Sequence, residues 1–169
     1  SFFNIYKSFK TYLIIEMSHI PMAHFCFKYS IALSLISQLK FMKNYKKYFS
    51  IAAPPEDVYL ALTVQTTMLL WTGEDVVMST VPGSEFSLWD GSIEGKNLEF
   101  VEGKKIVQEW YFGDQEEPSI VTIILHPDKK DSTSVELRHS NIPDEAYDEI
   151  VEGWNGPYFG ALQEFYEGE

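Results

Sequence analysis

The side chains that most often perform acid–base or metal chemistry are few in this sequence. The four histidines are His19, His24, His126 and His139. The last two have no second histidine or cysteine at the spacing of a metal site, and each fits a structural or surface role. No nucleophile elbow, phosphate-binding loop or dinucleotide fingerprint is present. We therefore expect no catalytic residue, no metal ligand and no cofactor, and we do not expect an enzyme.

Aromatic side chains are the second group that could carry a function. The chain has 12 Phe, 10 Tyr and 4 Trp, and rings of this size either fill a core or line a cavity. Strand alternation and helical periodicity place one set of residues on faces that would meet in the interior. These candidate cavity residues are Phe86, Leu88, Ile106, Gln108, Trp110, Ile123, Leu137, Trp154 and Tyr158. If they surround a cavity rather than fill a core, Gln108 is the polar member that would orient an apolar ligand.

The elements that position these residues follow from turn signals and hydrophobic periodicity. The pattern predicts a first strand over residues 45–52. Pro54-Pro55-Glu56-Asp57 then opens a short helix, because proline and acids suit a first helical turn. A second short helix is predicted over residues 64–71. Strands joined by tight turns are then expected over residues 86–89, 92–101, 105–112, 119–126 and 133–140.

The C-terminal segment is predicted to be one long helix. Pro143-Asp144-Glu145 is a typical start, and apolar residues recur every three or four positions after it. Proline in a helix interior typically costs about 3 kcal/mol, so we expect a kink or break between Gly153 and Pro157, either a tolerated bend or a reshaped cavity mouth. This order of elements predicts an α+β fold, in which a curved antiparallel sheet wraps around the C-terminal helix, with two short helices after the first strand.

Charge is distributed unevenly along the chain. The formal net charge is −12. Residues 1–41 contain four lysines and one glutamate, a net charge of +3, so residues 42–169 carry −15. A domain this acidic has no attraction for phosphate backbones or anionic lipids, and we expect neither nucleic acid nor membrane as a partner of residues 42–169. The charge fits either a basic protein partner or solubility alone.

Composition also changes near Met42. Residues 1–41 are rich in Phe, Tyr, Ile and Ser, and Lys28 interrupts their apolar run, which argues against a membrane span. We interpret residues 1–41 as an N-terminal extension, either a mis-assigned start or a leader, with a membrane-associating or partner-binding helix as the alternative. The single cysteine, Cys26, lies in this segment and cannot form an internal disulfide, which fits a cytoplasmic protein.

Several segments of residues 42–169 resemble those of one family, in the same order. Phe86-Ser87-Leu88-Trp89-Asp90-Gly91-Ser92-Ile93-Glu94-Gly95 is similar to the strand pair characteristic of activators of the heat-shock protein 90 ATPase. Residues 105–110, 119–123 and 133–137 are similar to the family's following strands. The final helix is matched by Ile142-Pro143, Gly153-Trp154 and Tyr158-Phe159. The ordered set covers residues 45–165 and is specific, whereas each motif alone is not.

The resemblance implies the helix-grip fold of the START-like (SRPBCC) superfamily, whose members often hold a cavity between the sheet and the long helix. It also implies a heat-shock protein 90 type chaperone as a partner. The activators have a further N-terminal domain that makes most of the chaperone contact, and residues 1–41 are too few to form it. Two functions remain open. One is a non-enzymatic protein that binds a small apolar molecule in the cavity, and the alternative is a co-chaperone-type module that binds the chaperone and stimulates its ATPase.

Overall fold

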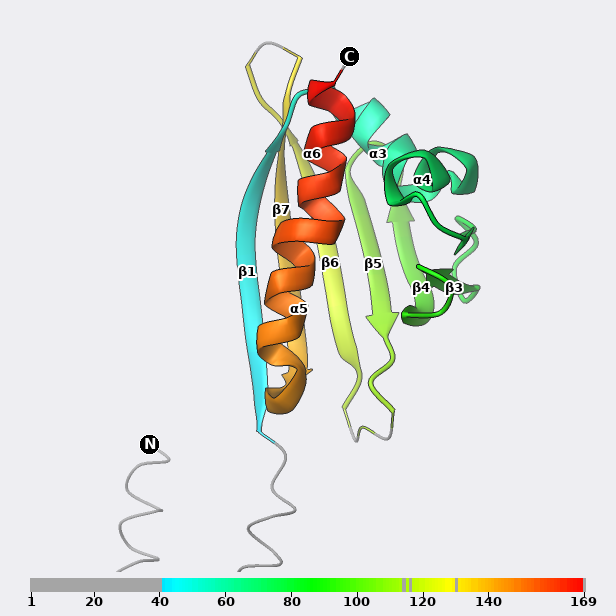
Figure 1. Ribbon diagram of the computed structural model, residues 1–169, viewed down its shortest axis with the longest axis vertical. Helices are drawn as coiled ribbons and strands as arrows, with labels where there is room; N and C mark the ends of the chain where they lie inside the picture. Colours follow the sequence, from blue (N-terminus) through cyan, green and yellow to red (C-terminus); the bar gives the residue numbers. More distant parts are fainter. Residues whose placement is uncertain (1–40, 114, 116, 130, 169) are drawn as a thin grey trace, which may run out of the picture. The chain divides into compact units, whose positions relative to one another are not determined.

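One antiparallel sheet with a long helix across one face organises the fold (Figure 1). The computed structural model describes residues 41–113, 115, 117–129 and 131–168. The strands are β1 (Met42–Ile51), β2 (Val76–Val77), β3 (Glu85–Leu88), β4 (Ile93–Val101), β5 (Lys105–Trp110), β6 (Ser119–Pro127) and β7 (Thr133–Pro143). Their order in the sheet is β1-β7-β6-β5-β4-β3-β2, so the first strand pairs with the last and β2 lies at the far edge.

Two groups of helices accompany the sheet. The helices α3 (Pro55–Thr63) and α4 (Gln65–Thr72) follow β1. The tail comprises η1 (Asp144–Ala146), α5 (Tyr147–Gly153), the π-helical turn η2 (Trp154–Tyr158) and α6 (Phe159–Glu167). Figure 1 shows α5 and α6 as one column in front of β7 and β6, with α3 and α4 beside α6. The predicted α+β helix-grip architecture is thereby confirmed.

The core lies between the sheet and this column. Every second residue is buried in β5, and in β6 as far as Leu125, as the strand period requires. On the helical side, Trp154, Phe159 and Leu162 are each no more than 1% exposed. Phe159 stacks on Phe49 of β1 with ring centroids 4.3 Å apart, which fixes the column against the sheet.

The irregularity expected in the C-terminal helix is present as a π-helical turn rather than a break. Its wide turn is closed by a hydrogen bond from the Phe159 N–H to the Trp154 carbonyl, and Pro157 lies inside it. Proline has no N–H to donate to the residue four positions earlier, so a wider turn accommodates it at low cost. The turn also brings Trp154, Tyr158 and Phe159 together in the interior.

Sequence and structure differ mainly at element ends and at one short strand. The predicted strand over residues 105–112 ends at Trp110, and the one over residues 133–140 continues to Pro143. The edge strand β2 was not predicted, because two residues are too few to show a period. The proposed extension over residues 1–41 lies outside the described residues, apart from Phe41, and stays a prediction.

Candidate functional site

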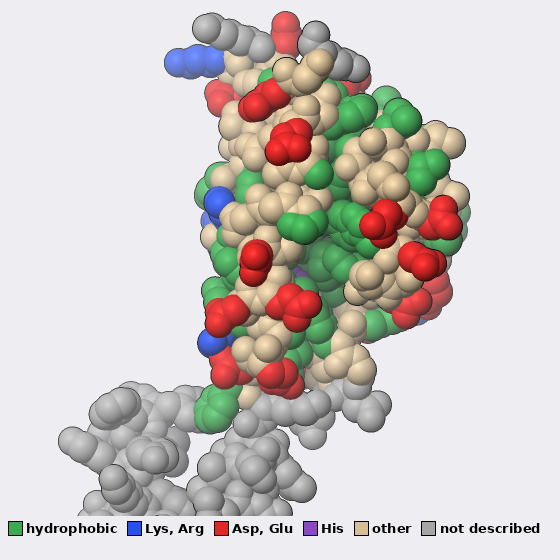
Figure 2. Space-filling model, viewed as in Figure 1, with side chains coloured by type: hydrophobic (Ala, Val, Ile, Leu, Met, Phe, Trp, Pro, Cys, Tyr) green, Lys and Arg blue, Asp and Glu red, His purple; other side chains and the backbone are tan. Residues whose placement is uncertain are grey.

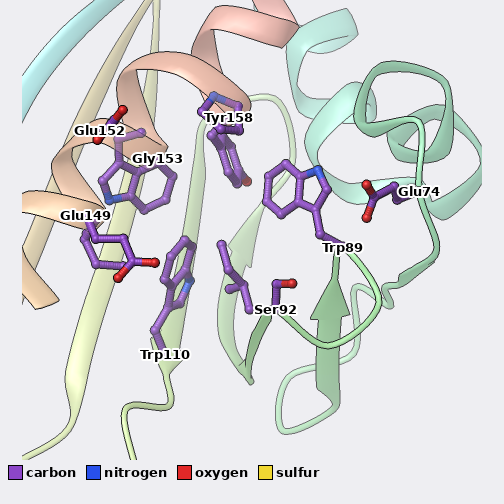
Figure 3. Close-up of a pocket in the computed structure, with 12 residues that line it drawn as sticks. Glu74, Trp89, Ser92, Trp110, Glu149, Glu152, Gly153 and Tyr158 are labelled. Atoms are coloured by element: carbon purple, nitrogen blue, oxygen red, sulfur yellow. The ribbon is translucent and has the colours of Figure 1, made fainter.

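A cavity of about 500 Å³ lies between the C-terminal helix and the β3–β5 part of the sheet. Its lining residues are Glu74, Trp89, Ser92, Ile93, Trp110, Glu149, Ile150, Glu152, Gly153, Trp154, Pro157 and Tyr158. Figure 3 shows the helix residues on one side of this space, with Trp89 and Glu74 on the other. Figure 2 shows hydrophobic side chains along the same groove, with acidic side chains on both sides. The volume falls within the range of about 300–1,000 Å³ that is typical of small-molecule sites.

Four of the lining residues form a continuous aromatic wall, namely Trp89, Tyr158, Trp154 and Trp110. The ring centroids of Trp89 and Tyr158 are 5.8 Å apart, and those of Tyr158 and Trp154 are 4.6 Å apart. Trp154 stacks on Trp110 at 4.6 Å with an interplanar angle of 29°. Behind the wall, Trp71 contacts both Trp89 and Tyr158. These contacts stabilise the arrangement of rings in the wall.

Trp89 reaches the cavity from a turn with unusual backbone angles. Trp89, Asp90 and Gly91 have φ values of 51°, 52° and 86° between β3 and β4. The Ser92 N–H donates to the Trp89 carbonyl at 3.1 Å and closes the turn. A left-handed conformation costs roughly 1–2 kcal/mol for a residue with a side chain, so contacts elsewhere must hold Trp89 there. Its contacts with Trp71 and Tyr158 are such contacts.

A buried chain of hydrogen bonds orients Trp110. The Trp110 indole N–H donates to Gln108 Oε1 at 3.3 Å, and Gln108 Nε2 donates to Asn97 Oδ1 at 2.8 Å. Asn97 Nδ2 in turn donates to the Ser79 carbonyl and to Ser84 Oγ. Gln108 is 2% exposed and does not line the cavity. Both ends of its amide are therefore used to position Trp110 within the protein.

A second buried chain orients Trp154. The Trp154 indole N–H donates to His139 Nδ1 at 3.1 Å, and His139 Nε2 lies 2.7 Å from Ser119 Oγ. Because an indole nitrogen can only donate, Nδ1 carries no proton, and Nε2 must be the protonated nitrogen that donates to Ser119. Ser119 Oγ then donates to the Ser140 carbonyl at 3.2 Å. His139 is thus a neutral residue linking β6 and β7 to the helix.

Burial controls the protonation of two residues at the site. Desolvation lowers the pKa of His139 to about 3, which keeps its imidazole neutral over the physiological range. Desolvation also raises the pKa of Tyr158, so that its phenol stays protonated. Neither residue brings a charge to the aromatic wall, and His139 has both ring nitrogens engaged. This arrangement fits a structural role for His139, as its sequence context predicted.

The rim of the cavity is acidic. Glu74 follows α4, whereas Glu149 and Glu152 belong to α5, and all three side chains are exposed. Within the described residues none of them has an ion-pair partner, and no lysine, arginine or histidine lines the cavity. The site therefore combines aromatic faces with uncompensated negative charge.

The nine candidate residues from the sequence separate into two groups. Trp110, Trp154 and Tyr158 line the cavity. The remaining six, which are buried but belong to the packed core or its polar network, are Phe86, Leu88, Ile106, Gln108, Ile123 and Leu137. Sequence reasoning did not select Trp89 or the three glutamates, although the turn signal Asp90-Gly91 beside a tryptophan was a usable cue. That the cavity holds a ligand stays a prediction.

In the part of the chain that the structure describes, no group of three or more histidine, cysteine, aspartate or glutamate side chains is placed to hold a metal ion. No helix within the same residues is long and apolar enough to cross a membrane.

Known proteins resemble this chain in both sequence and fold. A relative from Dictyostelium discoideum, an activator of 90 kDa heat shock protein ATPase homolog, is 33% identical over 102 residues, which is 59% of this chain. The match spans only 27% of that relative, about a quarter of its length. The crystal structure of an HSP90 activator from Plasmodium falciparum is 26% identical, with a TM-score of 0.68 over 76% of this chain and 97% of that one.

The fold also matches the solution structure of the Aha1 dimer from Colwellia psychrerythraea, with a TM-score of 0.65 and 21% identity over 75% of this chain and 97% of that one. A family model described as activator of Hsp90 ATPase homolog 1-like protein matches residues 52–167. This match begins directly after β1 and ends with α6, so it includes every element that borders the cavity. The chain therefore belongs to the activator of Hsp90 ATPase homolog 1-like protein family.

Proposed function

We propose that this protein is a co-chaperone-type module that binds an Hsp90-type chaperone and stimulates its ATPase. The observation that carries the proposal is the match to the Plasmodium falciparum activator, which extends over 97% of that chain at 26% identity. The family assignment over residues 52–167 supports it further. A cytoplasmic location is part of the proposal, since the single cysteine fits a reducing compartment.

Charge provides the physical basis for association. With −15 on residues 42–169, a basic surface on the chaperone would be attracted over a Debye length of about 10 Å at 0.1 M salt. Charged side chains at the edge of a protein–protein interface increase the association rate and make that rate dependent on salt. We therefore expect binding that weakens as ionic strength rises.

The test is a titration of the full, isotopically labelled chain with the Hsp90-type chaperone of its own host, followed by NMR at low and at moderate salt. Saturable shifts or broadening confined to one face, together with faster ATP hydrolysis by the chaperone, are expected. An unchanged spectrum at high micromolar chaperone contradicts the proposal.

Two charge-reversal variants locate the binding face. Glu164→Lys/Glu167→Lys changes α6, whereas Glu94→Lys/Glu102→Lys changes β4 and the turn that follows it. All four side chains are exposed. Both variants alter the net charge equally, so a difference in affinity between them reports the position of the contact rather than total charge. Equal and small effects would show that neither surface takes part.

A second candidate function is non-enzymatic binding of a small apolar molecule in the cavity. The specific observation in its favour is the cavity of about 500 Å³ with its ordered aromatic wall. The indole N–H signals of Trp89, Trp110 and Trp154 report on this space directly. A metabolite and lipid screen that moves these signals supports ligand binding, and a screen that moves none of them contradicts it.

A further inference from the structure

We propose that the cavity binds a small organic cation with an apolar body, whose positive charge lies against the aromatic wall and is balanced by the acidic rim. This inference rests on the second candidate function, ligand binding in the cavity, and specifies its ligand class. Three properties of the site lead to it: the sign of the charge around the opening, the faces of the aromatic rings, and an unpaired hydroxyl.

Charge at the opening selects for a cation. Glu74 lies on one side of the space, and Glu149 and Glu152 lie on the helix at the other side (Figure 3). Because no basic side chain lines the cavity, the negative charge of an anionic ligand would find no positive partner there and would be repelled by the glutamates. The negative charge of the surrounding domain adds to the same field.

The aromatic wall supplies the matching surface inside. A cation within about 6 Å of a ring centroid is attracted by the negative face of the ring, most strongly for tryptophan. The wall holds three tryptophans and one tyrosine, and hydrogen bonds fix Trp110 and Trp154 in place. Rings already held in position lose little conformational freedom when a ligand binds.

The hydroxyl of Tyr158 lacks a partner within the described residues. The residue as a whole is only 3% exposed, yet none of the fully buried side-chain oxygen and nitrogen atoms of the described residues lacks a partner, so the hydroxyl oxygen itself must be accessible. Figure 3 shows the ring pointing from the helix into the space between Trp89 and Trp110, which places this oxygen at the cavity. A polar atom that opens onto a largely apolar cavity is available to a polar group of a ligand. An ammonium N–H of the ligand is a suitable donor to this oxygen.

The size of the cavity indicates a small molecule rather than one side chain of a partner protein. A volume of about 500 Å³ corresponds to sites that enclose drug-sized ligands. A lysine side chain would leave much of the aromatic wall uncovered. The occupant therefore needs both a charged nitrogen and an apolar body.

A matched set of probes separates charge from shape. The full chain is titrated with 2-naphthylmethylamine, which is protonated at pH 7, with neutral 2-naphthylmethanol, and with anionic 2-naphthylacetate. The indole N–H signals of Trp89, Trp110 and Trp154 give the dissociation constants. We expect the amine to bind about 3- to 10-fold more tightly than the alcohol, as cation–π and rim attractions suggest. The acetate should bind most weakly of the three.

Two double variants test the rim. Glu149→Gln/Glu152→Gln should reduce the preference for the amine over the alcohol without abolishing it, because Glu74 and the aromatic rings remain, and should leave alcohol binding unchanged. The control Glu145→Gln/Glu164→Gln removes the same charge from the tail outside the lining set and should leave amine binding within about twofold. Equal binding of amine and alcohol to the unaltered chain overturns the cation inference but keeps ligand binding. Failure of all three probes to bind counts against both, and neither result bears on the chaperone proposal.

Discussion

At the scale of single residues, His139 links the site to the stability of the protein. Its imidazole joins Trp154 to Ser119 through two buried hydrogen bonds, and only the neutral form can accept from the indole. An unfolded histidine has a pKa of about 6.5, whereas desolvation lowers the pKa of His139 to about 3. Below pH 6.5 the unfolded chain therefore binds a proton that the native protein excludes, and stability decreases as pH falls.

The variant His139→Asn tests this linkage. Asparagine can still accept a hydrogen bond from Trp154 but does not titrate. Between pH 6.5 and pH 4.5 the unfolding free energy of both proteins can change with pH. That of the unaltered protein should fall more steeply than that of the variant, by up to about 1.4 kcal/mol per pH unit. Urea unfolding followed by tryptophan fluorescence measures both slopes. Parallel pH profiles for the two proteins would rule out His139 as the source.

Gly95 is a position where no other residue fits. A Cβ atom there would lie 2.1 Å from the Glu109 carbonyl oxygen and 2.6 Å from the Phe86 ring. Such overlap forces the backbone of β4 away from β5 or displaces a core ring. Gly153, in contrast, has helical backbone angles and nothing within 4 Å of an added Cβ.

These two glycines form a matched pair for mutation. Gly95→Ala should lower the unfolding free energy by about 1–3 kcal/mol or more. Gly153→Ala should be neutral or raise it by about 0.5–1 kcal/mol, because alanine restricts the unfolded chain. Denaturant unfolding of both variants provides the comparison. Equal destabilisation by the two changes would show that the close contact at Gly95 relaxes freely.

The sequence predicted the site only in part, for physical reasons visible at this scale. Alternation placed Trp110 on the interior face, and helical spacing did the same for Trp154 and Tyr158. Periodicity cannot distinguish a residue that lines a cavity from one that fills a core, so Phe86 and Leu88 were grouped with them. The position of the Trp89 side chain depends on a turn with left-handed backbone angles. Neither strand alternation nor helical periodicity predicts such a position.

At the scale of elements, Glu136 connects three strands on the outer face of the sheet. Its carboxylate lies 2.7 Å from Lys46 of β1, 2.7 Å from Arg138 of β7 and 3.0 Å from His126 of β6. Hydrogen bonds from Lys46, Arg138 and His126 lower the pKa of Glu136 to about 2. Because the folded state favours the carboxylate, these contacts stabilise the protein above about pH 4.5 and are lost as pH falls towards 2.

The variant Glu136→Gln should be less stable than the unaltered protein at pH 7, and the difference should shrink between pH 4.5 and pH 2. The control is Glu99→Gln, which breaks an ion pair with Lys105 in which the glutamate side chain is 50% exposed. Such exposed pairs contribute little, so the control should remain close to the unaltered protein at both pH values. A constant difference for Glu136→Gln across the pH range would contradict the linkage.

The helices and strands were predictable where hydrophobic periodicity extends over many residues and tight turns mark the ends of the segment. The strands from β3 to β7 and the start of the C-terminal helical segment directly after Pro143 were each indicated by several independent signals. The π-helical turn is different, since proline predicted an irregularity but not its form. Whether a helix bends, breaks or widens at Pro157 depends on the rings packed around it. That packing is tertiary and is not contained in local sequence.

At the scale of the whole molecule, the cavity exists only when the domain is folded. Glu74 and Trp89 come from segments before β4, Trp110 ends β5, and Tyr158 lies in the tail. An unfolded chain cannot gather these groups, so a ligand of the cavity binds the native state alone. Binding must then stabilise the protein by mass action.

Thermal unfolding with 2-naphthylmethylamine tests this coupling. At a free concentration ten times the dissociation constant, stabilisation should be about 1.4 kcal/mol, which raises Tm by several degrees for a domain of this size. In Glu149→Gln/Glu152→Gln the same concentration should raise Tm less, while Glu145→Gln/Glu164→Gln should keep the full shift. If the amine moves the indole signals but leaves Tm unchanged in every protein, it also binds the unfolded chain, and the native cavity is not its specific site.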